Sequence, residues 1–445
     1  MRPSSSPSEG GLFDGVLARG PVRSCVDDAA WLQALLDAEA GLARAQAAVG
    51  LLPWTHAEAI SSACDASRFD LAALGREAAS GGNPVIPLVR HLTAAVPGEA
   101  AGQVHRGATS QDIMDTAAML VAHRALGPLL DDLRGAASGA ARLAGAHRST
   151  VTTGRTLLQH ALPVTFGLTA AGWMSALDAA SLRLAEVRAS RLAVQLGGAA
   201  GTLASLGADG IAVCDAYAGA LGLAAPDLPW HTDRTRVAEL ASALGTLAGA
   251  VTKIGRDVVL LAQTEVAEVS ERSPGGSSTM PHKRNPVAAV SAVAAGLRAP
   301  GLVSTVLGAM AQEHQRGAGP WHAEWLPLRD LLTTTGSAVA WLRDCLENLV
   351  VDADRMRSNL DRTGGLLLAE RVTTALAPRL GRLAAHDLVE KACVPGRPFA
   401  EALTDAGIPA DEVAELLDPA GYLGSAEAFV DRALAAHAST VEVST

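Results

Sequence analysis

The sequence predicts an all-α fold in which long helices form a central bundle. Signals for β-strands are almost absent, and apolar residues recur at helical spacing over stretches much longer than the average helix of ~11–12 residues. Aromatic residues make up only 3% of the 445 residues, whereas Ala, Leu, Val and Arg are abundant, which favours close helix packing through small side chains. Several stretches are apolar on more than one face, so we expect them to be buried against other helices or other subunits.

Six helical stretches are expected along the chain, and the last five are the long rods. The first is capped by Asp27 or Asp28 and ends at Gly50, and the second contains Pro128, which is expected to kink or break it. Pro163 suits the first turn of the third helix. The fourth has no proline and few glycines, so at ~1.5 Å per residue it forms a rod longer than ~50 Å. The expected ranges, in order, are 27–49, 112–147, 163–191, 235–271, 286–312 and 326–350.

The character of the chain changes after Thr363, where two glycines are followed by shorter helices with more proline and glycine. We therefore expect three consecutive domains. An N-terminal helical domain covers residues 1–111, the bundle of long helices covers 112–362, and a small C-terminal helical domain covers 363–445.

Composition and termini exclude several classes of protein. The net charge is −10 and no basic run is present, which argues against a nucleic-acid partner. The five cysteines are far apart and form no Cys-x-x-Cys pair, so we expect no metal site and reduced thiols in a cytoplasmic protein. The N-terminus has no apolar signal segment. No window of 18 uninterrupted apolar residues occurs, since even 286–312 contains Arg298 and Pro300, and we expect no membrane partner.

Three segments rich in Gly, Ser, Thr and His interrupt the helical pattern at residues 105–112, 153–163 and 275–286, and we call them the first island, the second island and the signature loop. Hydroxyls and amides placed just before a helix N-terminus attract anions, because free N–H groups and the helix dipole point there. Simple helix capping is the alternative for each segment taken alone. Three such segments together favour an enzyme that binds carboxylates.

The signature loop contains Lys283, one of only three lysines in a chain whose basic charge is otherwise arginine. Lysine offers a compact point charge on a flexible stem, where arginine offers a planar fork. The glycines that precede two serines in this loop allow the backbone to fold over a ligand.

Residues 276–286, Gly-Ser-Ser-x-Met-Pro-x-Lys-x-Asn-Pro, resemble the signature of the fumarase/aspartase superfamily at every fixed position. The Thr-Ser-x-Asp of 109–112 and the Gly-Arg-Thr-x-x-Gln of 154–159 resemble its other two shared regions, and the resemblance extends from about residue 12 to about residue 436. Within the superfamily, segments 27–50, 159–167 and 321–325 resemble the 3-carboxy-cis,cis-muconate cycloisomerase branch.

This resemblance implies a three-lobed subunit in a homotetramer with a twenty-helix core, in which each active site combines the three segments from three subunits. It implies a small di- or tricarboxylate substrate and no metal or organic cofactor. The shared chemistry removes a proton beside a carboxylate, passes through an enediolate-like carbanion and expels a group from the neighbouring carbon.

The resemblance also implies residue roles. Ser277 matches the general base, and Lys283 and Asn285 match the groups that hold the substrate carboxylate as charge builds on it. The matching substrate-binding positions are Thr109, Ser110, Gln159, Ser278, Met280, Arg234 and Arg316. For the two arginines, structural ion pairs are the alternative.

Histidines are candidates for any further proton transfer. His160 is the catalytic candidate, with a structural role as the alternative. For His322 the alternative is packing between Trp321 and Trp325, and His105 and His282 receive no role.

Two positions depart from the superfamily pattern. Fumarases and adenylosuccinate lyases carry a histidine where this chain has Leu157, and its glutamate partner where this chain has Val290. Without that pair, expelling an amine or hydroxide is costly, whereas a carboxylate can leave as the anion because its acid has a pKa of ~4.

The departures favour a cycloisomerase, with a lyase that releases fumarate from a nitrosuccinate-type substrate as the alternative and an adenylosuccinate-type lyase less favoured. A catalytically inactive structural relative is disfavoured because Ser277, Lys283 and Asn285 are all present.

Overall fold

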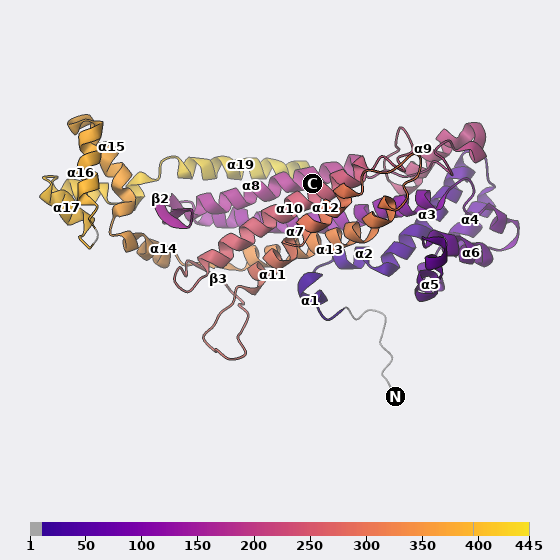
Figure 1. Cartoon of the computed structure of the whole chain (residues 1–445), viewed down its shortest axis with the longest axis horizontal. Helices are drawn as coiled ribbons and strands as arrows, with labels where there is room; N and C mark the ends of the chain where they lie inside the picture. Colours follow the sequence, from indigo (N-terminus) through magenta and orange to yellow (C-terminus); the bar gives the residue numbers. More distant parts are fainter. Residues whose placement is uncertain (1–10, 395, 445) are drawn as a thin grey trace. The chain divides into compact units, whose positions relative to one another are not determined.

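The computed structural model describes residues 11–394 and 396–444, and helices make up most of this part of the chain (Figure 1). The longest helices are α3 (Asp28–Ala48), α7 (Ser110–Ala146), α8 (Phe166–Glu186), α10 (Thr235–Leu261), α13 (Pro320–Glu347) and α19 (Ala426–Ser444). The others are α1 (Asp14–Leu17), α2 (Val22–Val26), α4 (Trp54–Ala63), α5 (Leu71–Gly81), α6 (Val85–Ala95), α9 (Gly210–Leu221), α11 (Val287–Gly296), α12 (Ala299–Gly308), α14 (Ala353–Leu360), α15 (Ala369–Leu380), α16 (Arg382–Ala392), α17 (Phe399–Asp405) and α18 (Ala410–Leu416).

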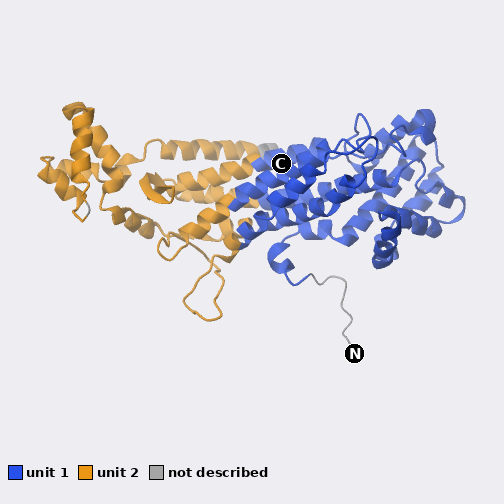
Figure 2. Ribbon diagram, viewed as in Figure 1, with its two compact units in different colours: residues 1–133, 180–252, 291–341 blue, residues 134–179, 253–290, 342–445 orange. Residues whose placement is uncertain are grey.

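The chain forms two compact units, each built from three segments of the sequence (Figure 2). Unit 1 comprises residues 1–133, 180–252 and 291–341, and unit 2 comprises 134–179, 253–290 and 342–445. This division follows contacts rather than chain order, and the three consecutive domains expected from the sequence remain a prediction.

Local sequence explains the start of α3 and its packing within unit 1. Asp27 accepts a hydrogen bond from the N–H of Ala30 at 2.8 Å, which confirms the expected cap. Gly41 lets α3 approach α9 closely, since a Cβ at this position would lie 2.7 Å from Leu221 and 3.2 Å from Tyr217. Small residues therefore set the spacing of these helices, as the composition predicts.

Several helix boundaries differ from those expected. Helix α7 continues through Pro128 as one element, so the proline does not break it. The range expected at 286–312 is divided into α11 and α12, and Pro300 lies in the first turn of α12, where a missing N–H costs nothing. Helix α10 ends at Leu261, earlier than expected, and the chain then enters a short strand.

The second island is a β-hairpin and not a helix start, so the expectation for Pro163 was wrong. Strand β1 (Val151–Thr156) pairs antiparallel with β2 (Gln159–Thr165), and Pro163 lies in β2 opposite Thr153. Leu157 and Leu158 form the two-residue turn, both at positive φ, which is the backbone geometry of a type I′ turn. A second antiparallel pair joins β3 (Val269–Glu271) to β4 (Leu349–Val351), both in unit 2.

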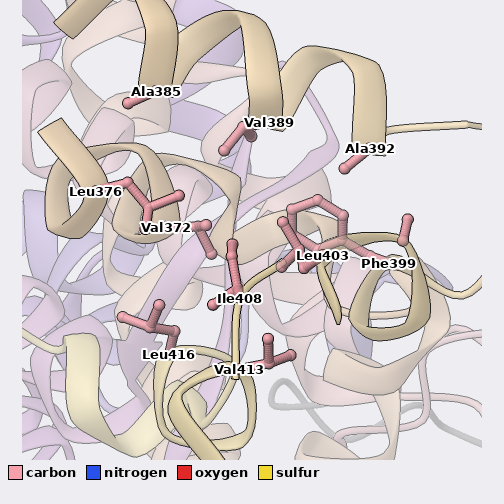
Figure 3. Close-up of a cluster of buried hydrophobic side chains, with 11 residues drawn as sticks. Val372, Leu376, Ala385, Val389, Ala392, Phe399, Leu403, Ile408, Val413 and Leu416 are labelled. Carbon is pink, nitrogen blue, oxygen red and sulfur yellow. The ribbon is translucent and has the colours of Figure 1, made fainter. Parts of the chain in front are cut away.

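The C-terminal part of unit 2 has an apolar core of its own (Figure 3). Its buried members all lie between residues 372 and 416, on α15 to α18 and the segments between them. Phe399 and Leu403 of α17 lie beside Ile408, and all three are almost fully buried. The predicted C-terminal domain at 363–445 contains this complete cluster.

Two stretches have the length and hydropathy of a membrane-crossing helix, namely Thr235–Leu261 and Val287–Gly308. Of the most apolar window in each, 56% and 39% respectively is buried inside the protein. Core helices of globular proteins have the same composition, so these stretches are weak evidence for a membrane span.

Candidate active site

The signature loop leaves the helices of unit 2 between β3 and α11 (Figure 1). It is closed at its base by Gly275 and Asn285, whose N–H groups donate to each other's carbonyl oxygens at 2.9 and 3.0 Å. The Asn285 side chain also donates to the carbonyl of Gly276 at 3.1 Å. Since an amide has two N–H donors, one donor of Asn285 remains for a ligand.

Within the loop, Ser277 accepts hydrogen bonds at its Oγ from the N–H groups of Thr279 (3.3 Å) and Met280 (3.1 Å). These contacts leave the hydroxyl proton free for transfer. Lys283 is exposed, and its N–H donates to the carbonyl of Met280 at 3.1 Å, which makes a turn between serine and lysine. The structure thus places the predicted base and the predicted carboxylate-binding residues on one loop whose described side chains form no hydrogen bond to one another.

The hairpin of the second island forms one wall of a cavity of about 550 Å³ in unit 2, and α10 contributes to the other wall. His160 and Thr153 line this cavity, and His160 Nδ1 and Thr153 Oγ1 are buried without a hydrogen-bond partner in the described structure. Burial lowers the pKa of His160, and Arg155 lowers it further, while Glu268 opposes the shift. His160 is therefore set to be neutral near pH 7, the state in which an imidazole accepts a proton.

Glu268 is a fully buried carboxylate beneath this hairpin. It accepts hydrogen bonds from Arg155 at 2.5 and 3.0 Å, from Thr152 at 3.3 Å and from Asn359 at 2.8 Å. The arginine of the Gly-Arg-Thr region therefore holds the hairpin in place. Gln159 is exposed at the first position of β2, next to the turn.

The first island lies in unit 1, and α7 begins there at Ser110, two residues before the expected start at residue 112. The N–H of Thr109 donates to the Asp112 side chain at 2.9 Å, the reciprocal half of a capping box. Asp112 is fully buried, and it also accepts hydrogen bonds from the N–H groups of Gly197 and Gly198 and pairs with His231 at 2.7 Å. Four partners around one carboxylate fix the backbone that presents Thr109 and Ser110.

Arg316 and Thr109, both predicted to bind substrate, are in contact in unit 1. Arg316 Nη1 donates to Thr109 Oγ1 at 2.7 Å, and both residues are partly exposed. A guanidinium next to a hydroxyl at a helix N-terminus is a site suited to a carboxylate.

Arg234 is in a different environment, since its side chain is 3% exposed and lies between two carboxylates. Its guanidinium donates to Asp115 at 2.8 and 3.0 Å and to Glu324 at 2.7 to 3.1 Å, and a longer bond of 3.5 Å reaches the carbonyl of Trp230. All five N–H donors are engaged. The substrate role of Arg234 stays a prediction, and the contacts favour the structural ion pair that the sequence left as its alternative.

Two other histidines have clear surroundings in unit 1. The exposed ring of His322 packs against Trp321 at 5.0 Å and Trp325 at 4.8 Å between ring centroids, in agreement with the packing alternative. His105 lies at positive φ and pairs through Nδ1 with the buried Glu39 at 2.6 Å. Burial lowers the pKa of His105, but Glu39 and Asp112 outweigh it and the net shift is upward.

Comparison with known proteins identifies the family. A family profile described as Lyase matches residues 22–301, and one described as Adenylosuccinate lyase C-terminus matches residues 365–433. The chain belongs to the lyase family of the fumarase/aspartase superfamily. It is therefore an enzyme of that superfamily, and its helical fold is the fumarate lyase fold.

Relatives of this lyase cover nearly its whole length. A 3-carboxy-cis,cis-muconate cycloisomerase of Pseudomonas aeruginosa is 49% identical over 96% of the chain and 96% of its own length. A nitrosuccinate lyase of Streptomyces davaonensis is 46% identical over 96% of the chain and 94% of its own length. The crystal structure of 3-carboxy-cis,cis-muconate lactonizing enzyme from Pseudomonas putida superposes with a TM-score of 0.91 at 45% identity, covering 97% of this chain and 99% of that one.

Leu157 and Val290, the two departures noted in the sequence, are apolar and exposed in the structure. Leu157, at the turn of the hairpin, is 96% exposed, and its neighbour Leu158 is 71% exposed. Val290, in the first turn of α11, is 48% exposed. Neither Leu157 nor Val290 can donate or accept a proton.

Sequence reasoning missed the buried carboxylates that support the predicted site residues in this lyase. They are Glu39, Glu268, Glu271 and Glu324, each at most 7% exposed. A signal existed for Glu39, because it interrupts an apolar run in α3, and an acid is rarely buried there without a partner.

Proposed function

We propose that this chain is a 3-carboxy-cis,cis-muconate cycloisomerase, an enzyme that interconverts a tricarboxylate diene and its lactone. The observation that carries the proposal is a complete signature loop together with the loss of both proton-transfer positions. Ser277, Lys283 and Asn285 are present, while Leu157 and Val290 are aliphatic. Relatives named as this cycloisomerase, 48% and 49% identical over nearly the whole chain, support the same substrate.

Lactone formation needs one C–O bond and one C–H bond. A carboxylate oxygen of the substrate adds to one carbon of a double bond, and the electron pair of that bond moves onto the neighbouring carbon and its carboxylate. Ser277 then gives its hydroxyl proton to that carbon, and solvent replaces the proton. The tricarboxylate of charge −3 takes up one proton to give a lactone of charge −2. In reverse, the ring carboxylate leaves as a weakly basic anion, so no general acid at Leu157 is needed.

Lys283 and Asn285 are proposed to bind the carboxylate on which negative charge develops, because a fixed cation and an amide N–H stabilise an enediolate as an oxyanion site does. Thr109 and Arg316 are proposed to bind a second carboxylate, with Ser110 and Gln159 as further hydrogen-bonding partners and Ser278 and Met280 as loop contacts. The neutral His160 is proposed to exchange protons with the loop serine or with solvent.

The active enzyme is proposed to be a cytoplasmic homotetramer with a twenty-helix core and three-lobed subunits, in which each site combines the two islands and the loop from three subunits. The exposed Leu157 and Leu158 support this assembly, because two leucines at a hairpin turn are a costly surface for a monomer. In unit 1, Leu297 just after α11 and Leu307 on α12 are likewise 53% and 43% exposed. The chemistry requires no metal or organic cofactor.

The test is turnover of 3-carboxy-cis,cis-muconate by the purified protein, followed as the loss of diene absorbance when the lactone forms. We expect saturable turnover that depends on Ser277. Inertness towards this compound at all protein concentrations, with release of fumarate from another substrate, would overturn the proposal.

A second candidate is a nitrosuccinate lyase, favoured by the relative of that name at 46% identity over 96% of the chain. Nitrite, like a carboxylate, leaves as a weakly basic anion, so the same aliphatic positions are compatible with it. In this reaction Ser277, after losing its own proton to solvent, takes the proton beside the carboxylate as an alkoxide, the neighbouring C–N bond breaks, and fumarate and nitrite are released. Assay of both products with nitrosuccinate, beside the diene assay, decides between the two substrates.

A further inference from the structure

The strand before the signature loop carries a buried acid that contacts the helix after the loop. Glu271 is the last residue of β3 and is 7% exposed. Its Oε2 accepts a hydrogen bond from the N–H of Ala288 at 3.1 Å, and its Oε1 accepts one from the N–H of Ala289 at 2.9 Å. These two alanines are the second and third residues of α11 and are themselves buried.

The carboxylate thus caps α11 from across the whole loop. The first N–H groups of a helix have no partner inside the helix, and the positive end of the helix dipole lies there. A bidentate carboxylate satisfies two of these N–H groups at once and is held by charge as well as by hydrogen bonds. Both ends of the segment 272–287 are therefore fixed by one side chain.

Neighbouring contacts fix the strand that carries Glu271. Glu271 pairs with Leu349 of β4, and the N–H of Arg272 donates to the carbonyl of Asn348 at 3.0 Å. Cys345 on α13 is a fully buried thiol whose pKa is raised, first by burial and then by the negative charge of Glu271. The carboxylate is accordingly a rigid anchor point.

Next along the chain, the two ends of the loop are joined by the backbone hydrogen bonds between Gly275 and Asn285. A Cβ at Gly275 would lie 2.2 Å from Val287, so only glycine fits there. Beyond this pair, the side-chain hydrogen bonds of the described loop residues run only to other loop residues. The position of Ser277 and Lys283 is therefore set by the base of the loop.

We infer that Glu271 is a positioning residue for the reaction. By fixing β3 to the start of α11, it limits the loop to the few conformations in which Ser277 and Lys283 close over the substrate together. It touches neither substrate nor reacting atoms. The inference rests on the proposed function, because it assigns Glu271 to the turnover that this loop performs.

The experiment compares wild type with Glu271→Gln, which keeps the size of the side chain and one acceptor oxygen. The amide leaves one of the two helix N–H groups facing an NH₂ group, so the cap is lost on one side. We expect kcat with 3-carboxy-cis,cis-muconate to fall about 10-fold or more, since loop closure precedes chemistry, while KM changes less than about 3-fold. Glu271→Asp, which keeps the charge, should restore part of kcat.

Hydrogen exchange of backbone amides provides a readout that needs no turnover. In Glu271→Gln, the non-proline amides of residues 276–285 and those of Ala288 and Ala289 should exchange faster, with no change in the C-terminal cluster of α15–α18. Asp352→Ala is the matched control, because Asp352 caps α14 of the same unit through the N–H of Arg355 at 2.8 Å and does not contact the loop. That variant should keep wild-type kcat and loop exchange.

Faster exchange confined to the loop and its helix start, with loss of kcat, supports the inference. Unchanged loop exchange and unchanged kcat in Glu271→Gln overturn it. Faster exchange throughout unit 2 with normal kcat per folded molecule also overturns it, because Glu271 is then only structural. If the wild type does not turn over the diene, the proposed function fails, and loop exchange still decides the role of Glu271 as an anchor.

Discussion

The first island and the signature loop carry similar residues but are held in opposite ways. In the first island, Thr109 and Ser110 start a long helix whose Asp112 is fully buried and has four partners. In the loop, Ser277 and Lys283 are held by hydrogen bonds to neighbouring loop residues and by the base at Gly275 and Asn285.

In the proposed function, this difference corresponds to a division of labour between a preformed carboxylate site and a closing loop. A rigid site loses little entropy on binding, and a loop with few buried contacts can open locally at small cost. Changes in the loop should therefore affect turnover with little effect on stability. Substitution of the buried residues that contact the first island should lower the stability of the protein. Substitution of its partly exposed residues should weaken substrate binding.

The largest effect is expected from Ser277→Ala, which removes the proposed base. Turnover should fall by about two to four orders of magnitude, the usual contribution of a positioned general base. The melting temperature should stay near that of wild type, because the hydroxyl contacts only loop amides. Initial rates and thermal denaturation measure both quantities, and the control is Ser273→Ala, an exposed serine between β3 and the signature loop. Retention of more than a tenth of wild-type kcat would show that another group takes the proton.

The next largest effect, on stability, is expected at Arg234, which lies buried between two carboxylates in unit 1. Arg234→Met leaves Asp115 and Glu324 buried without their cation, which should cost about 3–5 kcal/mol in the free energy of unfolding. Urea unfolding measures the loss. The control is Arg183→Met, because Arg183 forms an exposed pair with Glu186 at 2.9 Å and such pairs contribute less than about 1 kcal/mol. A stable Arg234→Met protein with a raised KM would instead make Arg234 a substrate clamp.

The surface of the first island is tested by Arg316→Lys. Lysine keeps the charge but loses the planar fork that pairs with a carboxylate at two points. We expect KM to rise about 10-fold, equivalent to about 1.4 kcal/mol, with kcat and stability nearly unchanged. Steady-state kinetics and urea unfolding measure this separation. Combination with Thr109→Val in a double-mutant cycle gives the coupling through the 2.7 Å contact, and strict additivity would contradict a shared carboxylate site.

Much of the fold follows from patterns that are local in sequence. The cap of α3 at Asp27 and the start of α7 beside Thr109 depend on residues a few positions apart. The cap matches the expectation, and α7 starts two residues before the expected position. The hairpin of the second island was missed because its turn is made by Leu157 and Leu158, where turn residues such as Asn and Gly were absent. Its cross-strand pairing overrides the helix signal of Pro163.

The buried ion pairs that hold the predicted site segments could not be predicted, because the two partners of each pair are distant in sequence. Arg155 and Glu268 are separated by 113 positions, and Glu39 and His105 by 66. Periodicity reports which face of a helix is apolar, but it does not report which acid meets which base after folding. The residues of the signature loop could be named from the sequence because their motif is contiguous, and their roles stay predictions.

The smallest expected effect is on the pH dependence of the unfolding free energy, and it comes from the His105–Glu39 pair, whose histidine belongs to the first island. Burial lowers the pKa of His105, but Glu39 and Asp112 raise it more, so the folded protein binds this proton more tightly than the unfolded chain. The pair should therefore stabilise the protein by about 1 kcal/mol below pH ~6.5, and this contribution should be lost as pH rises through the raised pKa. The difference in unfolding free energy between wild type and Glu39→Gln should accordingly be larger at pH 6 than at pH 9. In a His105→Asn background the same substitution should show no such pH dependence, whereas a dependence that persists there would assign the effect to another group.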